Sequence, residues 1–349
     1  MPNASSSPPP SSWWGSSWPS SGPAANASCA PPAPGGCANG SGPPSPPPAG
    51  ALPGAPLAVA VAVVYALLGA VALAGNSAVL LVLLRAPRRS VTHLFLLNLA
   101  AADQLCALVL PVNIADLLLR RWPLGELACK LVVAADQYNT LCGLYFPAVL
   151  GADRYRVVLA AARSRRAAGR TRGAARAVAL AVWALATLVV LPFAVFARLD
   201  DEQGRRQCVL VFPRPEAAWW RASRLYSLLL GFVLPASALC GLYCALLCRL
   251  RAARPAGGPA RALGRARRRA TRLVLAIVAA CLLCWTPYHL GTVVALTADL
   301  PHTPAVVAAS YVITGLSYAH SCLNPFLYAF LDDGFRQGLR RLLACRPAA

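Results

Sequence analysis

Long apolar segments alternate with short basic ones along the chain, and this pattern predicts a bundle of helices that cross a membrane. A helix needs about 20 apolar residues to cross a bilayer core of roughly 30 Å. Seven segments reach that length, at about residues 57–84, 92–119, 130–158, 175–197, 223–248, 273–297 and 304–330. The third and seventh are the least hydrophobic, so we expect them to line the centre of the bundle, where their polar side chains face protein.

The segment before the first span has a different character. Residues 1–56 contain no Lys, Arg, Asp or Glu and are rich in Ser, Pro, Gly and Ala, which predicts a disordered tail. Asn3, Asn26 and Asn39 each begin an Asn-X-Ser sequon. If the tail lies outside the cell, these three asparagines are expected to carry glycans.

A short helix is predicted after the seventh span. Phe335 and Leu339 alternate with Arg336 and Arg340, a pattern typical of an amphipathic helix that lies on a membrane surface. Cys345 follows at the inner end of this helix, where it is placed for reversible palmitoylation.

The composition agrees with a membrane protein and argues against a soluble one. Only 13% of the residues are charged and the mean hydropathy is +0.54, whereas soluble domains are roughly 25% charged. A net charge of +21 is compatible with nucleic-acid binding, but the arginines lie between apolar segments rather than on one face of a soluble domain. No nucleic-acid partner is expected.

The distribution of basic residues predicts the orientation. Of the 33 Lys and Arg residues, 24 lie at or beyond the ends of the spans on the side that follows the first, third, fifth and seventh, and basic residues near span ends favour the cytosol. The amino terminus is therefore expected outside the cell, in a multi-pass plasma-membrane protein that contacts membrane lipids. The predicted fold is an all-α membrane protein: an extracellular tail (1–56), a seven-transmembrane-helix bundle (57–330) and a cytoplasmic amphipathic helix with a short tail (331–349).

Cys129 and Cys208 lie beside or between the spans on the expected extracellular side, where disulfides persist. A bridge between Cys129 and Cys208 would pin the loop before the fifth span across the mouth of the bundle. A second pair in the tail, Cys29 and Cys37, is also open, and nothing in the sequence decides whether it forms.

Short polar motifs occur in the order of the spans and resemble those of the rhodopsin-like G-protein-coupled receptors. They are Gly75-Asn76, Leu99 with Asp103, Asp153-Arg154-Tyr155, Trp183, Pro235 with Tyr243, Cys284-Trp285-Thr286-Pro287 and Asn324-Pro325-Phe326-Leu327-Tyr328. The resemblance covers about residues 57–345. It implies a receptor that promotes nucleotide exchange on a heterotrimeric G protein, and no enzyme activity.

Asp136, with Gln137, Tyr138 and Asn139, resembles the opioid and somatostatin branch of that family. This closer resemblance implies a peptide ligand and a G protein of the inhibitory class. The stretches 193–212 and 281–290 are most similar to a neuropeptide receptor within the branch. A basic or aromatic peptide of the opioid or somatostatin type is the alternative.

Asp136 is the predicted ligand anchor. It lies seven residues after Cys129, or roughly 10 Å below the outer end of the third span. A carboxylate there would attract an ammonium or guanidinium group of a ligand; an internal bond to a tyrosine such as Tyr318 is the alternative. The resemblance implies that Gln137, Trp285, Tyr288 and Tyr318 line the same cavity.

The loop before the fifth span carries three successive acids, Asp200, Asp201 and Glu202. They either steer a basic peptide toward the cavity or form a solvated loop face, and the sequence does not decide between the two.

Asp103 lies near mid-membrane, where a carboxylate needs a partner. The resemblance implies a polar network of Asn76, Asp103, Asn139, His320, Ser321 and Asn324, in which a sodium ion favours the inactive state. A neutral Asp103 in a hydrogen-bonded network is the alternative. Gly143 and His320 depart from the family pattern and remove one oxygen ligand, so sodium binding stays open, and no other cofactor is expected.

The inner end of the third span is the predicted G-protein switch. Arg154 can bond its neighbour Asp153 or an entering partner, and the resemblance adds Tyr155, Tyr243 and Tyr328 to this group. In the middle of the same span, Pro147 lacks a backbone N–H and predicts a local bend.

Other classes of membrane protein fit less well. A transporter is disfavoured because no inverted repeat is apparent and the span count is odd. A retinal protein is excluded because the only lysine, Lys130, lies at the outer end of the third span. The Cys281–Cys284 pair has no second pair or suitably spaced His beside it, so no metal site is expected.

Overall fold

The computed structural model describes residues 54–86, 90–162, 171–202, 205–252, 260–297, 303–331 and 333–344. The predicted glycosylation sites Asn3, Asn26 and Asn39, and the predicted palmitoylation site Cys345, lie outside these ranges. The elements are, in chain order, α1 (Ala55–Arg85), α2 (Val91–Leu119), α3 (Glu126–Ala162), α4 (Arg172–Phe196), β1 (Ala197–Glu202), β2 (Arg205–Leu210), α5 (Glu216–Leu228), the π-helical η2 (Leu229–Val233), α6 (Leu234–Ala252), α7 (Ala260–Thr297), α8 (Pro304–Leu331) and α9 (Asp333–Leu343).

Seven helical spans form the bundle, which confirms the predicted fold class. Six of them are long and apolar enough to cross a membrane among the described residues: α1, α2, α4, the continuous α5–η2–α6, α7 and α8. The remaining span, α3, is less apolar than these six. It contacts α2, α4, α6 and α7, which places it at the centre of the bundle as expected.

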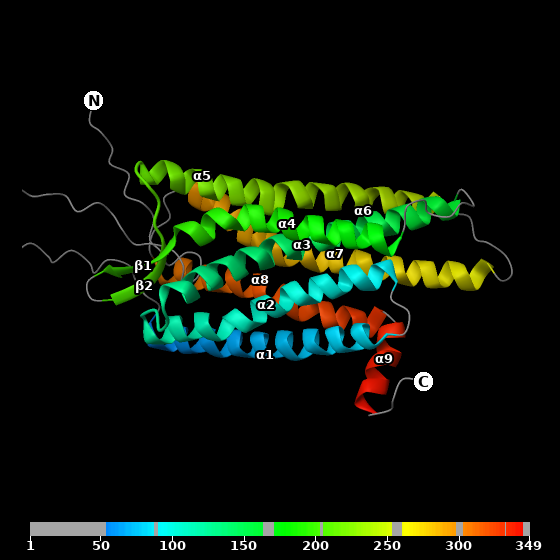
Figure 1. The fold of residues 1–349 in the computed structure, drawn as a ribbon, viewed down its shortest axis with the longest axis horizontal. Coiled ribbons are helices and arrows are strands. Elements are labelled where there is room, and N and C mark those ends of the chain that lie inside the picture. Colours follow the sequence, from blue (N-terminus) through cyan, green and yellow to red (C-terminus); the bar gives the residue numbers. More distant parts are fainter. Residues whose placement is uncertain are drawn as a thin grey trace, which may run out of the picture.

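The two ends of the bundle carry different attachments (Figure 1). A two-stranded antiparallel hairpin of β1 and β2 lies at one end, with Ala197 opposite Leu210 and Glu202 opposite Arg205. At the opposite end α9 turns across the direction of the bundle. The hairpin was not predicted from the sequence, which indicated helices alone.

Local signals define where several helices begin and end. The Ser90 and Thr171 hydroxyls accept bonds from the backbone N–H groups of His93 and Ala174, each at 3.1 Å, and thereby cap α2 and α4. At the end of α2, Arg120 adopts a left-handed conformation with φ 55°, and its N–H bonds to the Asp116 carbonyl. These caps satisfy backbone groups that the helices leave without intrahelical partners.

Close backbone approaches hold α1 to its neighbours. A Cβ added to Gly75 would lie 2.8 Å from Cγ of Pro325 on α8, and one added to Gly338 of α9 would meet the Val82 side chain. Glycine is therefore required at both positions by the space available rather than by backbone conformation. The contact at Gly338, together with the buried ring of Phe335, docks α9 against the end of the bundle opposite the hairpin.

Replacing Gly75 with alanine tests the α1–α8 contact. The added methyl group must push α1 away from Pro325, so Gly75→Ala is expected to destabilise the detergent-solubilised protein by about 1–3 kcal/mol. Gly241→Ala is the matched control, because its Cβ would meet nothing within 4 Å. Thermal unfolding of both variants measures the effect, and equal midpoints would show that the contact can relax at no cost.

Candidate functional site

A cavity of about 40 Å³ lies inside the bundle toward the hairpin end. It is enclosed by α3, α7, α8 and the end of β2. Its lining includes all five residues predicted for the ligand site, together with six others, of which Asn139 was predicted for the polar network. The complete lining is Val133, Asp136, Gln137, Asn139, Thr140, Leu210, Trp285, Tyr288, Thr314, Ser317 and Tyr318.

Only one of the two carboxylate oxygens of Asp136 accepts a hydrogen bond from a described residue. Its Oδ2 accepts a bond from Nδ2 of Asn113 on α2 at 3.4 Å, and the same Nδ2 donates to Oη of Tyr318 at 3.1 Å. The other oxygen, Oδ1, is buried and has no hydrogen-bond partner within the described part of the chain. Asp136 therefore contacts Tyr318 through an amide, and one carboxylate oxygen remains available to a ligand.

Asn113 was missed in the sequence because it is outside the recognised motifs. It is buried, and it lies two residues after Pro111 in the mostly apolar second half of α2. An amide in an apolar span is expensive unless it is bonded, and that cost was a signal that Asn113 faces another polar group. The sequence around Asn113 did not show that this polar group is Asp136, which lies on another helix.

Aromatic rings form the floor of the cavity. Trp285 is almost fully buried, and its ring lies edge-on to Tyr288 with 5.8 Å between centroids. Next to Tyr288 on α7, and nearer the hairpin end, His289 stacks on Phe232 of η2 with 4.5 Å between ring centroids. Both rings of the floor belong to α7, so a ligand that presses on them presses on that helix.

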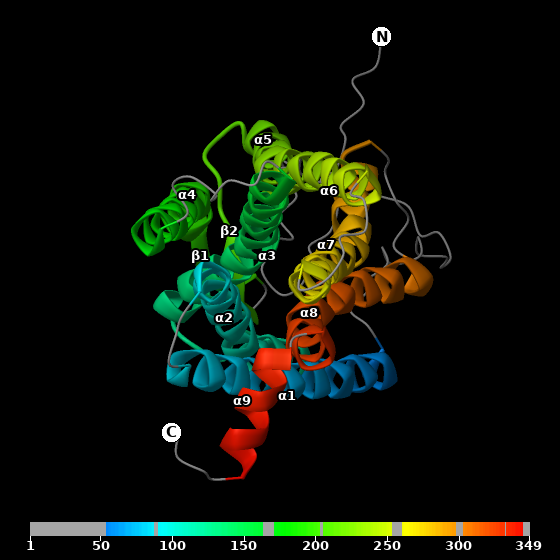
Figure 2. The same ribbon diagram turned by 90° about the vertical axis from the view of Figure 1, so that its right-hand side faces the viewer.

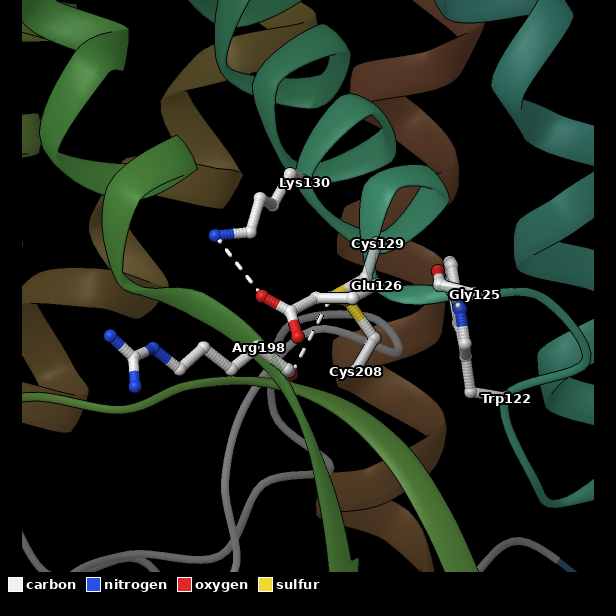
Figure 3. The surroundings of a disulfide bond; sticks show 7 residues. All are labelled: Trp122, Gly125, Glu126, Cys129, Lys130, Arg198 and Cys208. Atoms are coloured by element: carbon white, nitrogen blue, oxygen red, sulfur yellow. Dashed lines mark hydrogen bonds and ion pairs between the residues drawn. A yellow bond between two sulfur atoms is a disulfide. The ribbon is translucent and has the colours of Figure 1, made fainter.

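The β1–β2 hairpin lies beside the cavity and is joined covalently to α3. A disulfide joins Cys129, near the start of α3, to Cys208 on β2, and Figure 3 shows this bridge beside the Lys130–Glu126 ion pair of 3.2 Å. Trp122 Nε1 donates to the Gly125 carbonyl at 3.2 Å just before α3. The covalent tie keeps β2, and with it Leu210, against the cavity.

Two of the three acids of the hairpin lie opposite basic residues. Asp201 is paired in register with Arg206 and Glu202 with Arg205, while Asp200 faces Gln207. Opposite charges on facing strands cancel much of each other's field. This arrangement favours the interpretation of the three acids as a solvated hairpin face over the interpretation that they steer a basic peptide.

Below the cavity, most residues of the predicted polar network are bonded together. Asn324 Nδ2 donates to Asp103 Oδ2 at 2.8 Å, and Ser321 Oγ donates to Asn139 Oδ1 at 3.2 Å. Asn76 Nδ2 donates to the Ser321 carbonyl at 2.9 Å. These bonds connect α1, α2, α3 and α8 at mid-bundle.

His320 was expected in this network, but the structure places it elsewhere. Its ring lies beside Trp285 with 6.1 Å between centroids, and neither of its nitrogens bonds to any described residue. A Cβ added to Gly143 would lie 3.3 Å from Trp285 Nε1 and 3.4 Å from His320 Cε1. The two departures from the family pattern are thus a pair: a glycine on α3 makes room for an imidazole and an indole.

Three carbonyls freed by prolines are each bonded by a side chain from another helix. A proline at position i leaves the carbonyl at i−4 without its helical donor. Pro147 frees Gly143 O, which accepts from Cys281 Sγ on α7 at 3.0 Å, and Pro325 frees Ser321 O, which Asn76 bonds.

The third carbonyl lies in η2, where the donor would be five residues ahead. Leu234 N–H bonds Leu229 O in this π-helical pattern, so Pro235 leaves Leu230 O free, and Tyr145 Oη donates to it at 2.8 Å. Cys281 and Tyr145 were not predicted as structural residues, because nothing in their own neighbourhood marks them. The predicted bend at Pro147 stays a prediction.

The predicted switch residues gather at the end of the bundle that carries α9. Arg154 Nη2 pairs with Asp153 Oδ2 of its own helix at 3.1 Å, and Thr92 Oγ1 approaches the same oxygen at 3.5 Å. Tyr328 is buried against Phe335 with 6.0 Å between ring centroids, and Tyr243 packs against the main core. Tyr155 is half-buried on the next position of α3. Arg154 is thus held by its neighbour.

Comparison with known proteins shows extensive similarity to receptors. Residues 75–328 match the family model described as 7 transmembrane receptor (rhodopsin family). The chain is 69% identical to the neuropeptides B/W receptor type 1 of Bos taurus over 327 residues, 93% of this chain and 97% of the relative. It is 67% identical to the Homo sapiens protein of that name over 296 residues, 84% of this chain and 90% of the relative.

A more distant relative is the somatostatin receptor type 3 of Homo sapiens. It is 38% identical over 293 residues, which cover 83% of this chain and 69% of the relative. The order of the similarities agrees with the resemblance found in the sequence motifs.

A double-mutant cycle tests the bond between Cys281 and the carbonyl that Pro147 frees. Cys281→Ala leaves that buried carbonyl unbonded, with an expected loss of about 1 kcal/mol in the free energy of unfolding. In a Pro147→Ala background the backbone supplies an N–H, so the same substitution should cost less. Thermal unfolding of the four proteins in detergent gives the coupling. Equal losses in both backgrounds would show that the thiol is not compensating for the proline.

Proposed function

The chain belongs to the rhodopsin family of seven-transmembrane receptors, and we propose that it is a receptor for neuropeptides of the B/W type. The family consists of receptors rather than enzymes, and the chain is a multi-pass membrane protein of this family. We further propose that its amino terminus is extracellular, that it activates inhibitory G proteins, and that it thereby lowers cyclic AMP.

The observation that carries the proposal is Oδ1 of Asp136, the buried carboxylate oxygen without a hydrogen-bond partner among the described residues. It is called the spare oxygen below. An acceptor that is buried in a cavity and lacks a partner among the described residues is costly until a donor arrives. A positively charged donor on a peptide satisfies it, and a hydrogen bond to a charged group contributes about 1.5–3 kcal/mol. The aromatic floor beside it suits an apolar or aromatic group next to that charge.

The size of the cavity limits what enters it. About 40 Å³ holds a few small groups and not a whole peptide. One end of the ligand would enter and the remainder would lie over the hairpin. Entry has to widen the cavity, and its aromatic floor of Trp285 and Tyr288 belongs to α7, the helix in which Pro287 interrupts the backbone bonding.

Movement of α7 links the cavity to the switch. Cys281, one turn below Trp285, bonds the carbonyl of Gly143, so a shift of α7 breaks or moves its bond to α3. The same α3 carries Arg154 at its inner end. We propose that ligand entry releases the inner part of α7 from α3, and that Arg154 then exchanges Asp153 for the G protein.

The mid-bundle network fits a sodium ion in part. Asp103 Oδ1, Asn324 Oδ1 and Asn76 Oδ1 are buried oxygens without hydrogen-bond partners among the described residues, and such oxygens suit a small hard cation. We propose that Asp103 and Asn324 would hold the ion, whose positive charge would balance the Asp103 carboxylate when bound. His320 takes no part, because its ring lies at Trp285.

A peptide of the somatostatin or opioid type is the second candidate ligand. The relative at 38% identity is a somatostatin receptor, and a cationic ligand of either type would use the same spare oxygen. The higher identity to the neuropeptides B/W receptors favours the first candidate.

Cells that express the receptor test both candidates in one assay. We expect neuropeptides B and W to inhibit cyclic AMP formation at lower concentrations than somatostatin or opioid peptides. Asp136→Asn should weaken potency roughly 10- to 100-fold, the equivalent of one charge-assisted bond. Glu126→Gln is the control, since it removes an exposed acid of the same helix that pairs with Lys130.

Two results would contradict the proposal. If no member of the panel changed cyclic AMP, the inhibitory receptor assignment would fail. If Asp136→Asn and Glu126→Gln left potency equally unchanged, the ligand would not be anchored at Asp136.

A further inference from the structure

The free cysteines of the described residues fall into two groups by exposure. Five are buried in the bundle, whereas Cys240, Cys244 and Cys248 are exposed. All three exposed thiols lie on α6 at intervals of four residues, so they form one row along one face of a single helix. This row is called the α6 cysteine row below.

The α6 cysteine row looks away from the bundle. On the other side of the helix Leu239 and Leu246 are buried, and Tyr243 packs against the main core. Figure 2 shows α6 at the rim of the bundle. Cysteine is among the residue types most often buried. Because these three thiols are exposed on the outer face of α6, packing against the bundle does not explain their presence there.

The three thiols lie at different depths. In the sequence the apolar run of α6 reaches Cys248, and Arg249 and Arg251 follow it. Because arginines favour the aqueous boundary, Cys248 lies at the membrane surface, with Cys244 and Cys240 about 6 and 12 Å deeper. This inference rests on the topology proposed above, under which the boundary at Cys248 is the cytosolic one.

We propose that Cys248 is a site of S-acylation by a long-chain fatty acid. An exposed cysteine beside the cytosolic end of a span is accessible to membrane-bound acyltransferases that use long-chain acyl-coenzyme A. In the transfer, Cys248 Sγ forms a thioester with the acyl carbonyl carbon. The bond between that carbon and the coenzyme A sulfur breaks, and the thiol proton passes to coenzyme A.

The surface next to Cys248 has room for the acyl chain. A Cβ added to Gly241 would meet nothing within 4 Å, and the cysteines at 240 and 244 are themselves small and exposed. A chain that starts at Cys248 and runs into the bilayer would lie along this row. The attached chain would then hold the inner end of α6 at the membrane surface.

The test uses the full-length receptor in mammalian cells, in a Cys345→Ser background that removes the predicted tail site. Free thiols are blocked in denaturant, thioesters are cleaved with hydroxylamine, and the released thiols receive a polymer tag that shifts the apparent mass. We expect one hydroxylamine-dependent shift, lost in both Cys248→Ser and Cys248→Ala and retained in Cys240→Ser. The last variant is the matched control from the same row.

Absence of the shift, its survival in the Cys248 variants, or its loss in Cys240→Ser would overturn the proposal. The mass shift requires neither peptide nor G protein, so its failure leaves the proposed receptor function standing. Antibody binding to an amino-terminal epitope tag on intact cells tests the topology separately and shows that each variant reaches the surface.

Discussion

Three proline-freed carbonyls connect helices of the bundle, because a backbone acceptor inside a membrane needs a donor. Gly143, Leu230 and Ser321 each present such a carbonyl, and each is bonded by a side chain from another helix. The resulting bonds join α3 to α7, α3 to η2 and α1 to α8. The helices are therefore connected at points where one backbone bond has been replaced by a contact that a helix shift can break.

In the proposed function, the spare oxygen of Asp136 gives this arrangement its use. It lies on α3 above Gly143, and the switch residue Arg154 lies on the same helix below it. From 136 to 154 the helix rises roughly 27 Å, about the thickness of the apolar core. One helix thus carries the proposed recognition group, the bond to α7 and the proposed G-protein contact.

Hydropathy and motifs predicted the spans well, because burial in lipid demands long apolar segments whatever their neighbours. The predicted bounds are too short where a helix continues beyond its apolar run. For example, α7 begins at Ala260 rather than near 273, because its first turns are basic. The β1–β2 hairpin was missed because its strands are only six residues long and carry several charges, so neither has the long apolar run by which the spans were recognised. The bond of Asn113 to Asp136 and the displacement of His320 also depend on partners from other helices, which periodicity does not reveal.

Coupling between Asp136 and the positive charges of the peptide tests the central claim most directly. Binding constants would be measured for intact receptor and Asp136→Asn, each with the native peptide and with analogues in which one positive charge is removed. The account predicts that for one analogue the loss from Asp136→Asn disappears, because the partner of the spare oxygen is already gone. Losses that simply add for every analogue would show that this carboxylate does not bind a ligand cation.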